Sequence, residues 1–133
     1  MTDELTRLLE WLGRQGFVIS SFQGDRNGPD VLAAIYDWGE TADVLIMHSK
    51  TEARAYRALT GPEVDLLAPG YVVWTYFSNA VWTLRAVLTL PAPNHPEAPV
   101  IVQVAPPGIG LPMEDRRPVR LRMRQQYSLR GDR

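Results

Sequence analysis

Residues 31–48, VLAAIYDWGETADVLIMH, contain the pattern that decides the predicted fold. Two apolar runs, 31–38 and 42–48, lie on either side of a short segment that begins at Gly39. Apolar runs rich in β-branched and aromatic residues, separated by a turn segment, are typical of a β-hairpin. Both faces of the runs are largely apolar, so we expect two central strands that are covered on both sides.

The segment that precedes this hairpin predicts an amphipathic helix followed by a strand. Leucines recur at the spacing of one helical face, at Leu5, Leu8, Leu9 and Leu12. Thr2 is placed to cap the helix N-terminus, and Gly16 is a natural stop at its C-terminus. Residues 17–22 are then expected to form the first strand.

After the first hairpin, the sequence predicts a short helix and a second hairpin. Ser49 and Glu52 have the spacing of a capping box, which indicates a helix from there to about Leu59. Residues 71–77 and 81–90 are apolar runs around a turn at 78–80. In a three-residue turn register, the aromatic side chains of this second hairpin share one core face, at Trp74, Tyr76 and Trp82.

Two further strands are expected in the C-terminal third of the chain. Residues 100–104 form a short apolar run. In residues 119–124, apolar side chains alternate strictly with Arg120, Arg122 and Arg124. This alternation favours a half-buried strand with an arginine face over a free basic tail.

These elements predict an α+β fold with a mostly antiparallel, curved sheet. Two β-hairpins and C-terminal strands build the sheet, an N-terminal helix packs on it, and a short helix joins the hairpins. We expect a single domain over residues 1–124 and a loosely ordered tail over 125–133. A chain of 133 residues is long enough to bury a core as one domain.

The composition excludes several classes of protein. The chain has no cysteine, which rules out disulfides and thiolate metal sites. The N-terminus lacks the basic and apolar regions of a signal peptide, and no run of 18 uncharged apolar residues occurs. We therefore expect a cytoplasmic protein that does not enter a membrane, and the sequence predicts neither a metal site nor a cofactor.

The charge distribution is uneven. Residues 1–115 contain fourteen acidic and seven basic residues, whereas 116–133 contain seven arginines and one acidic residue. The interpretation we prefer is that Arg120, Arg122 and Arg124 contact this acidic body within the same chain, or that of a second copy in a homo-oligomer. A different protein partner is the second possibility. Nucleic acid is not expected, because the acidic body would repel phosphates.

Candidate catalytic residues are Asp37, Asp43 and His48. The two aspartates flank the hairpin turn and would face each other across a three-residue turn, where like charges are destabilising. A two-residue turn removes this clash and leaves two exposed acids, which is the interpretation we prefer; an acid–base or metal pair is the alternative. His48 precedes Ser49, but the G-x-S-x-G elbow of many hydrolases is absent.

Candidate ligand-binding residues come from the second hairpin. Arg85 is able to bind a carboxylate or phosphate through two hydrogen bonds. A concave pocket could be lined by the clustered aromatic residues Tyr36, Trp38, Trp74, Tyr76 and Trp82. Aromatic side chains at strand spacing more often form core, so this pocket remains the alternative.

The sequence therefore predicts a non-enzymatic binding module that acts through protein–protein contacts or self-association. The alternative is a small enzyme or a small-ligand-binding protein whose pocket lies over Trp74, Tyr76, Trp82 and Arg85. Whether the chain is an enzyme stays open, because an enzyme requires a concave site where several titratable groups converge.

Overall fold

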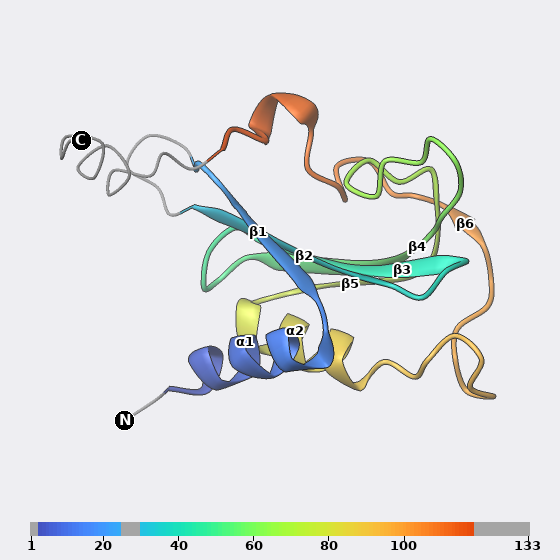
Figure 1. The fold of residues 1–133 in the computed structure, drawn as a ribbon, viewed down its shortest axis with the longest axis horizontal. Coiled ribbons are helices and arrows are strands. Elements are labelled where there is room, and N and C mark those ends of the chain that lie inside the picture. Colours follow the sequence, from blue (N-terminus) through green and yellow to red (C-terminus); the bar gives the residue numbers. More distant parts are fainter. Residues whose placement is uncertain (1–2, 25–29, 119–133) are drawn as a thin grey trace, which may run out of the picture.

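The computed structural model describes residues 3–24 and 30–118, and it confirms the α+β class with an open antiparallel sheet (Figure 1). Six strands follow one another across the sheet in chain order, each antiparallel to the next. In chain order, the elements are α1 (Glu4–Gln15), β1 (Val18–Phe22), β2 (Val31–Asp37), β3 (Thr41–Met47), β4 (Ala53–Leu59), β5 (Tyr71–Ser78), α2 (Ala80–Thr89), β6 (Gln103–Val104) and a 3-10 helix (Met113–Asp115).

Helix α1 forms where the leucine spacing predicts it. Asp3, and not Thr2, is the N-cap, and its carboxylate accepts a hydrogen bond from the backbone N–H of Thr6 at 2.8 Å. The hydrogen bonds from Thr6 lower the pKa of Asp3. The buried face of the helix is formed by Leu8 and Leu12, and Leu5 and Leu9 pack partly buried beside them.

Strands β2 and β3 form the predicted first hairpin, with a two-residue turn at Gly39 and Glu40. The N–H of Trp38 donates to the carbonyl of Thr41 at 2.8 Å, and Gly39 adopts a φ of 109° that favours glycine. In this register, Asp37 is opposite Ala42 and not opposite Asp43. The clash between the two aspartates in a three-residue turn is therefore avoided.

The helix predicted after Ser49 is wrong, because residues 53–59 form the central strand β4. Ser49 accepts a hydrogen bond from the N–H of Thr51, within a tight turn that joins β3 to β4. The sequence ARAYRAL has good helix formers, but β3 and β5 pair with it on both sides. Burial between two neighbouring strands outweighs a helix propensity of a few tenths of a kcal/mol per residue.

The second predicted hairpin is wrong as well, because only its first half is a strand. Residues 80–89 form α2, and the side chain of Asn79 caps this helix by accepting from the N–H of Trp82 at 2.9 Å. The buried residues follow helical spacing, at Ala80, Thr83, Leu84 and Val87. Trp82 consequently lies on the exposed side of the helix and does not oppose Trp74 across a hairpin.

The exposed position of Trp82 on α2 has a measurable consequence for stability. We expect Trp82→Ala to lower the free energy of unfolding by less than about 1 kcal/mol, because an exposed side chain loses little on truncation. The matched change Leu84→Ala should cost about 2–5 kcal/mol, because Leu84 is fully buried. Urea unfolding measures both values. A larger cost for Trp82 than for Leu84 would favour the hairpin.

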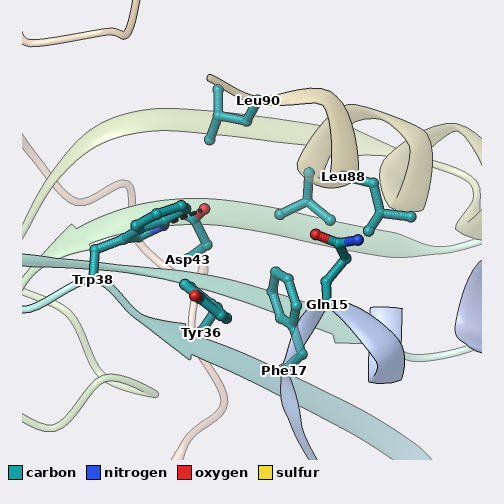
Figure 2. Close-up of a pocket in the computed structure, with 8 residues that line it drawn as sticks. Gln15, Phe17, Tyr36, Trp38, Asp43, Leu88 and Leu90 are labelled. Carbon is teal, nitrogen blue, oxygen red and sulfur yellow. Dashed lines mark hydrogen bonds between the residues drawn. The ribbon is translucent and has the colours of Figure 1, made fainter. Parts of the chain in front are cut away.

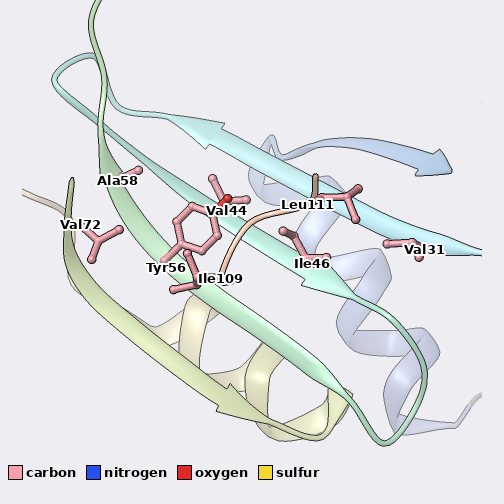
Figure 3. Close-up of a cluster of buried hydrophobic side chains, with 8 residues drawn as sticks. All are labelled: Val31, Val44, Ile46, Tyr56, Ala58, Val72, Ile109 and Leu111. Atoms are coloured by element: carbon pink, nitrogen blue, oxygen red, sulfur yellow. The ribbon is translucent and has the colours of Figure 1, made fainter. Parts of the chain in front are cut away.

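The sheet carries a hydrophobic cluster on each face. Helices α1 and α2 cover one face (Figure 1), where Leu12, Leu45 and Leu84 are fully buried. Segments 60–70 and 105–112 cover the other face, and Ile109 and Leu111 reach down onto the sheet there (Figure 3). This cluster also contains Val31, Val44, Ile46, Tyr56, Ala58 and Val72.

The two covering segments approach each other closely. The N–H of Leu111 donates to the carbonyl of Leu67 at 2.8 Å. A Cβ atom at Gly110 would lie 2.1 Å from that same carbonyl oxygen, so only glycine fits here. Arg116 adds an ion pair to Asp65 at 2.8 Å. Among the described residues, this face therefore has no α-helix over it, and it is covered by loops that backbone and charge contacts hold together.

The end of the described chain returns to the sheet beside β1. The N–H of Gln23 donates to the carbonyl of Arg117 at 2.6 Å, and Pro118 forms an antiparallel bridge with Phe22. The strand predicted for 119–124 and the tail predicted for 125–133 lie outside the described residues. In the run 100–104, only residues 103–104 form a strand.

Candidate functional site

A row of polar and aromatic side chains crosses the helix-covered face of the sheet. Tyr36 on β2 is opposite Asp43 on β3, Asp43 is opposite Arg57 on β4, and Arg57 is opposite Trp74 on β5. The ring of Phe17, which precedes β1, lies 5.4 Å from the ring of Tyr36 and extends the row. Antiparallel register alone thus brings together residues that are far apart in the sequence.

Asp43 and Arg57 form a buried ion pair at the centre of this row. Asp43 is 2% exposed and Arg57 is 0% exposed. The Nε of Arg57 donates to Oδ1 of Asp43 at 2.6 Å, and its Nη2 donates to Oδ2 at 2.9 Å. Two parallel hydrogen bonds of this kind fix the relative orientation of both side chains.

Trp38 contacts both residues of this ion pair. Its indole N–H donates to Oδ2 of Asp43 at 3.0 Å, and its ring lies 5.8 Å from the guanidinium carbon of Arg57. A carboxylate offers about four acceptor positions. Bonds from described residues occupy three of them, two on Oδ2 and one on Oδ1 of Asp43, so within this part of the chain Oδ1 has one further acceptor position.

The Nη1 atom of Arg57 is buried and has no hydrogen-bond partner among the described residues. Buried polar groups in native proteins are nearly always paired with protein or with ordered water. The charge of Arg57 is nonetheless compensated by Asp43, and burial from water makes that compensation essential.

A pocket of about 130 Å³ lies beside Asp43, between the sheet and the C-terminal ends of both helices (Figure 2). Its aromatic side is formed by Phe17, Tyr36 and Trp38, and the Tyr36 and Trp38 rings are 4.7 Å apart. The remaining lining residues are Gln15, Asp43, Val87, Leu88 and Leu90.

The C-terminal ends of the two helices place partial negative charge beside this pocket. Gln15 is the last residue of α1, and Leu90 is the C-cap of α2. Helix C-termini carry partial negative charge from their last carbonyl groups. Asp43 is the only ionisable carboxylate in the described lining. The pocket therefore combines an aromatic wall with negative partial charges.

The structure separates the candidate catalytic residues. Asp43 lies near the start of β3, whereas His48 follows its end, so the strand keeps them apart. His48 accepts a hydrogen bond through Nε2 from Arg54 at 2.6 Å. Asp37 accepts from the N–H of Gly39 in the hairpin turn. Asp43 is buried and paired, which differs from the exposed turn acid that we expected.

The candidate ligand-binding residues divide into two groups. Trp74 and Tyr76 are half-buried on β5, with stacked rings 6.1 Å apart. Trp82 and Arg85 lie on the exposed side of α2, where the guanidinium is 5.0 Å from the Trp82 ring and also pairs with Glu4. The predicted hairpin, whose aromatic face carried this candidate pocket, is therefore not formed.

The partner-binding arginines Arg120, Arg122 and Arg124 lie outside the described residues. Within residues 3–24 and 30–118, no group of three or more histidine, aspartate or glutamate side chains is arranged to hold a metal ion. In the same part of the chain, no helix is long and apolar enough to cross a membrane.

Sequence reasoning found part of the pocket and missed the rest. Tyr36 and Trp38 were candidates for a pocket wall, but Arg57 was hidden in the predicted helix. A signal for Arg57 existed: Asp43 lies in an otherwise apolar central strand, so its charge requires a buried partner. Phe17 and Gln15 join the site only through the packing of α1 on the sheet.

Comparisons of this chain with protein-family models, with curated proteins and with solved structures found no match.

Proposed function

We propose that this protein is a self-associating interaction module, in which the β6 edge of the sheet pairs with the same edge of a second copy. The observation that carries the proposal is the exposed apolar run at this edge. Its exposed fractions are 73% for Val100, 73% for Ile101, 52% for Val102 and 74% for Val104.

Edge strands in monomeric proteins are usually protected by charged residues or a covering segment, because unpaired backbone groups attract other strands. Here no charged residue occurs between Glu97 and Glu114. Prolines flank the run on both sides, at Pro99 and Pro106, but do not interrupt it. Tyr71, which pairs with Val104, is also exposed and extends the apolar surface.

The two edges of the sheet differ. At the β1 edge, the chain itself returns and pairs through residues 117 and 118. At the β6 edge, no described residue pairs with the outer side of Gln103–Val104. That pairing at the β1 edge reaches only Phe22 and Gln23, so the β6 edge is distinguished by its longer exposed apolar run, and it is the edge that we expect to pair with another chain.

The choice of a second copy as partner follows from symmetry. Antiparallel pairing about a two-fold axis at Val102 places Val100 opposite Val104, and Ile101 opposite Gln103 of the second copy. A two-fold axis brings residues near it close to their own copies, so a charge there would meet a like charge. Residues 100–104 carry no charge, so no like charges would meet at this axis.

Val102→Lys tests this pairing, because it places two ammonium groups next to the two-fold axis. We expect the wild-type protein to sediment as a dimer and Val102→Lys to sediment as a folded monomer, with at most the loss of stability that dissociation of the dimer causes. Val18→Lys is the matched control, since Val18 is a 70% exposed β-branched residue on the opposite edge. This control should remain dimeric.

Two results would contradict the proposal. One is a wild-type protein that stays monomeric up to about 1 mM, which corresponds to a very weak association. The other is a dimer that Val18→Lys dissociates and Val102→Lys does not.

A further inference from the structure

We propose that the pocket beside Asp43 binds a small, free organic ammonium ion. This site is independent of the β6 edge, and none of its lining residues belongs to the run 100–104. Three properties of the pocket carry the proposal: its size, its aromatic wall and the sign of the charge around it.

The size of the pocket limits the ligand to a small molecule. A cavity of about 150 Å³ holds one benzene molecule, and this pocket measures about 130 Å³. The ligand, or the part of it that enters, therefore has roughly six non-hydrogen atoms or fewer.

The aromatic wall favours a cation over a neutral group of the same size. Phe17, Tyr36 and Trp38 stand in one continuous array on one side of the pocket (Figure 2). Their neighbouring ring planes are inclined by 44° and 64°. Aromatic rings attract cations through their negative faces, most strongly when water is excluded, and clustered rings recognise alkylammonium groups in this way.

The charges around the pocket also favour a cation. The ion pair of Asp43 and Arg57 is neutral as a whole, and the C-termini of α1 and α2 add partial negative charge. Arg14 in the last turn of α1 is exposed, so solvent screens its charge. Asp43 lines the pocket, and a carboxylate there would accept a hydrogen bond from an ammonium that carries a proton.

The first experiment compares three probes by ligand-observed NMR on the wild-type protein. Tetramethylammonium and tert-butanol have the same branched shape and the same number of non-hydrogen atoms, but only the former is charged. Trimethylammonium also carries one N–H donor. We expect tetramethylammonium to bind about tenfold more tightly than tert-butanol, with methyl resonances shifted upfield by the aromatic rings. Trimethylammonium should bind more tightly still.

The second experiment uses variants that leave the buried ion pair intact. Gln15→Glu should strengthen tetramethylammonium binding and Gln15→Lys should weaken it, because residue 15 lines the pocket and is exposed to solvent. The same two changes at Met113 serve as a control, since this exposed residue lies in a segment on the opposite face of the sheet (Figure 1). Tyr36→Leu should reduce binding about tenfold, whereas Trp82→Leu should not.

Three results would contradict the proposal. Equal binding of tetramethylammonium and tert-butanol would overturn the proposal, because the pocket would then select for apolar shape alone. Absence of binding by both ammonium probes would overturn it as well. Binding that responds to Trp82 or Met113, and not to Tyr36 and Gln15, would place the site elsewhere.

Discussion

Asp43→Ala is expected to lower the free energy of unfolding by about 3–5 kcal/mol, which is the usual cost of breaking a buried ion pair by removing one partner. Arg57 is fully buried, and its guanidinium would retain no carboxylate. Trp38 would also lose the acceptor of its indole N–H. Urea unfolding monitored by tryptophan fluorescence measures this cost, provided that the slope of the transition is unchanged.

A double variant distinguishes charge burial from loss of packing. Asp43→Leu combined with Arg57→Met removes both charges and keeps apolar volume in the row. Replacing both partners of a buried pair is often neutral or stabilising, so we expect most of the stability to return. The exposed pair Glu4–Arg85 is the comparison, and Glu4→Gln should cost no more than about 1 kcal/mol. A cost for Asp43→Ala as small as that of Glu4→Gln would show that the pair is hydrated.

Leu12→Ala is the second substitution with a large expected effect. Leu12 is fully buried between α1 and the sheet, and a cavity there should cost about 2–5 kcal/mol. Leu9→Ala is the matched control on the same helix, because Leu9 is only partly buried and should cost less. The midpoints of urea unfolding give both values. Equal costs at the two positions would mean that α1 packs with a different face.

The ion pair and the pocket have different roles in these experiments. The pair of Asp43 and Arg57 supports the fold, so its variants report on stability. The pocket variants at Gln15 and Tyr36 leave that pair in place and report on binding. The edge variant Val102→Lys is remote from both and reports on association. Each proposal can therefore fail without affecting the others.

Local sequence patterns determined the elements whose stabilising contacts lie within a few residues. The leucine spacing and Gly16 are sufficient for α1, because a helix buries one face at a fixed period. Gly39 between two apolar runs is sufficient for the first hairpin, because the turn needs a residue at positive φ. The α+β class follows from these elements and the remaining apolar runs.

In some segments, the local preference for helix or strand conflicts with the packing. Which of the two such a segment forms was decided only by the tertiary structure. Residues 53–59 favour a helix by composition but form a strand, because β3 and β5 satisfy their backbone on both sides. Residues 80–89 contain many β-branched side chains but form α2, because Asn79 caps the helix and Leu84 packs with Leu12 in one cluster. In both cases, long-range burial outweighs small local propensities.

Almost all of the candidate site is decided by the tertiary structure, because its residues are far apart in the sequence. Asp43 and Arg57 are fourteen residues apart, and the β3–β4 register places them opposite each other. The pocket beside them also needs Gln15 and Leu88, which meet only because both helices lie on the same face of the sheet. The exposed run at 100–104 is the exception. Its apolar, uncharged composition is visible in the sequence, but its place at an open edge is set by the order of the strands.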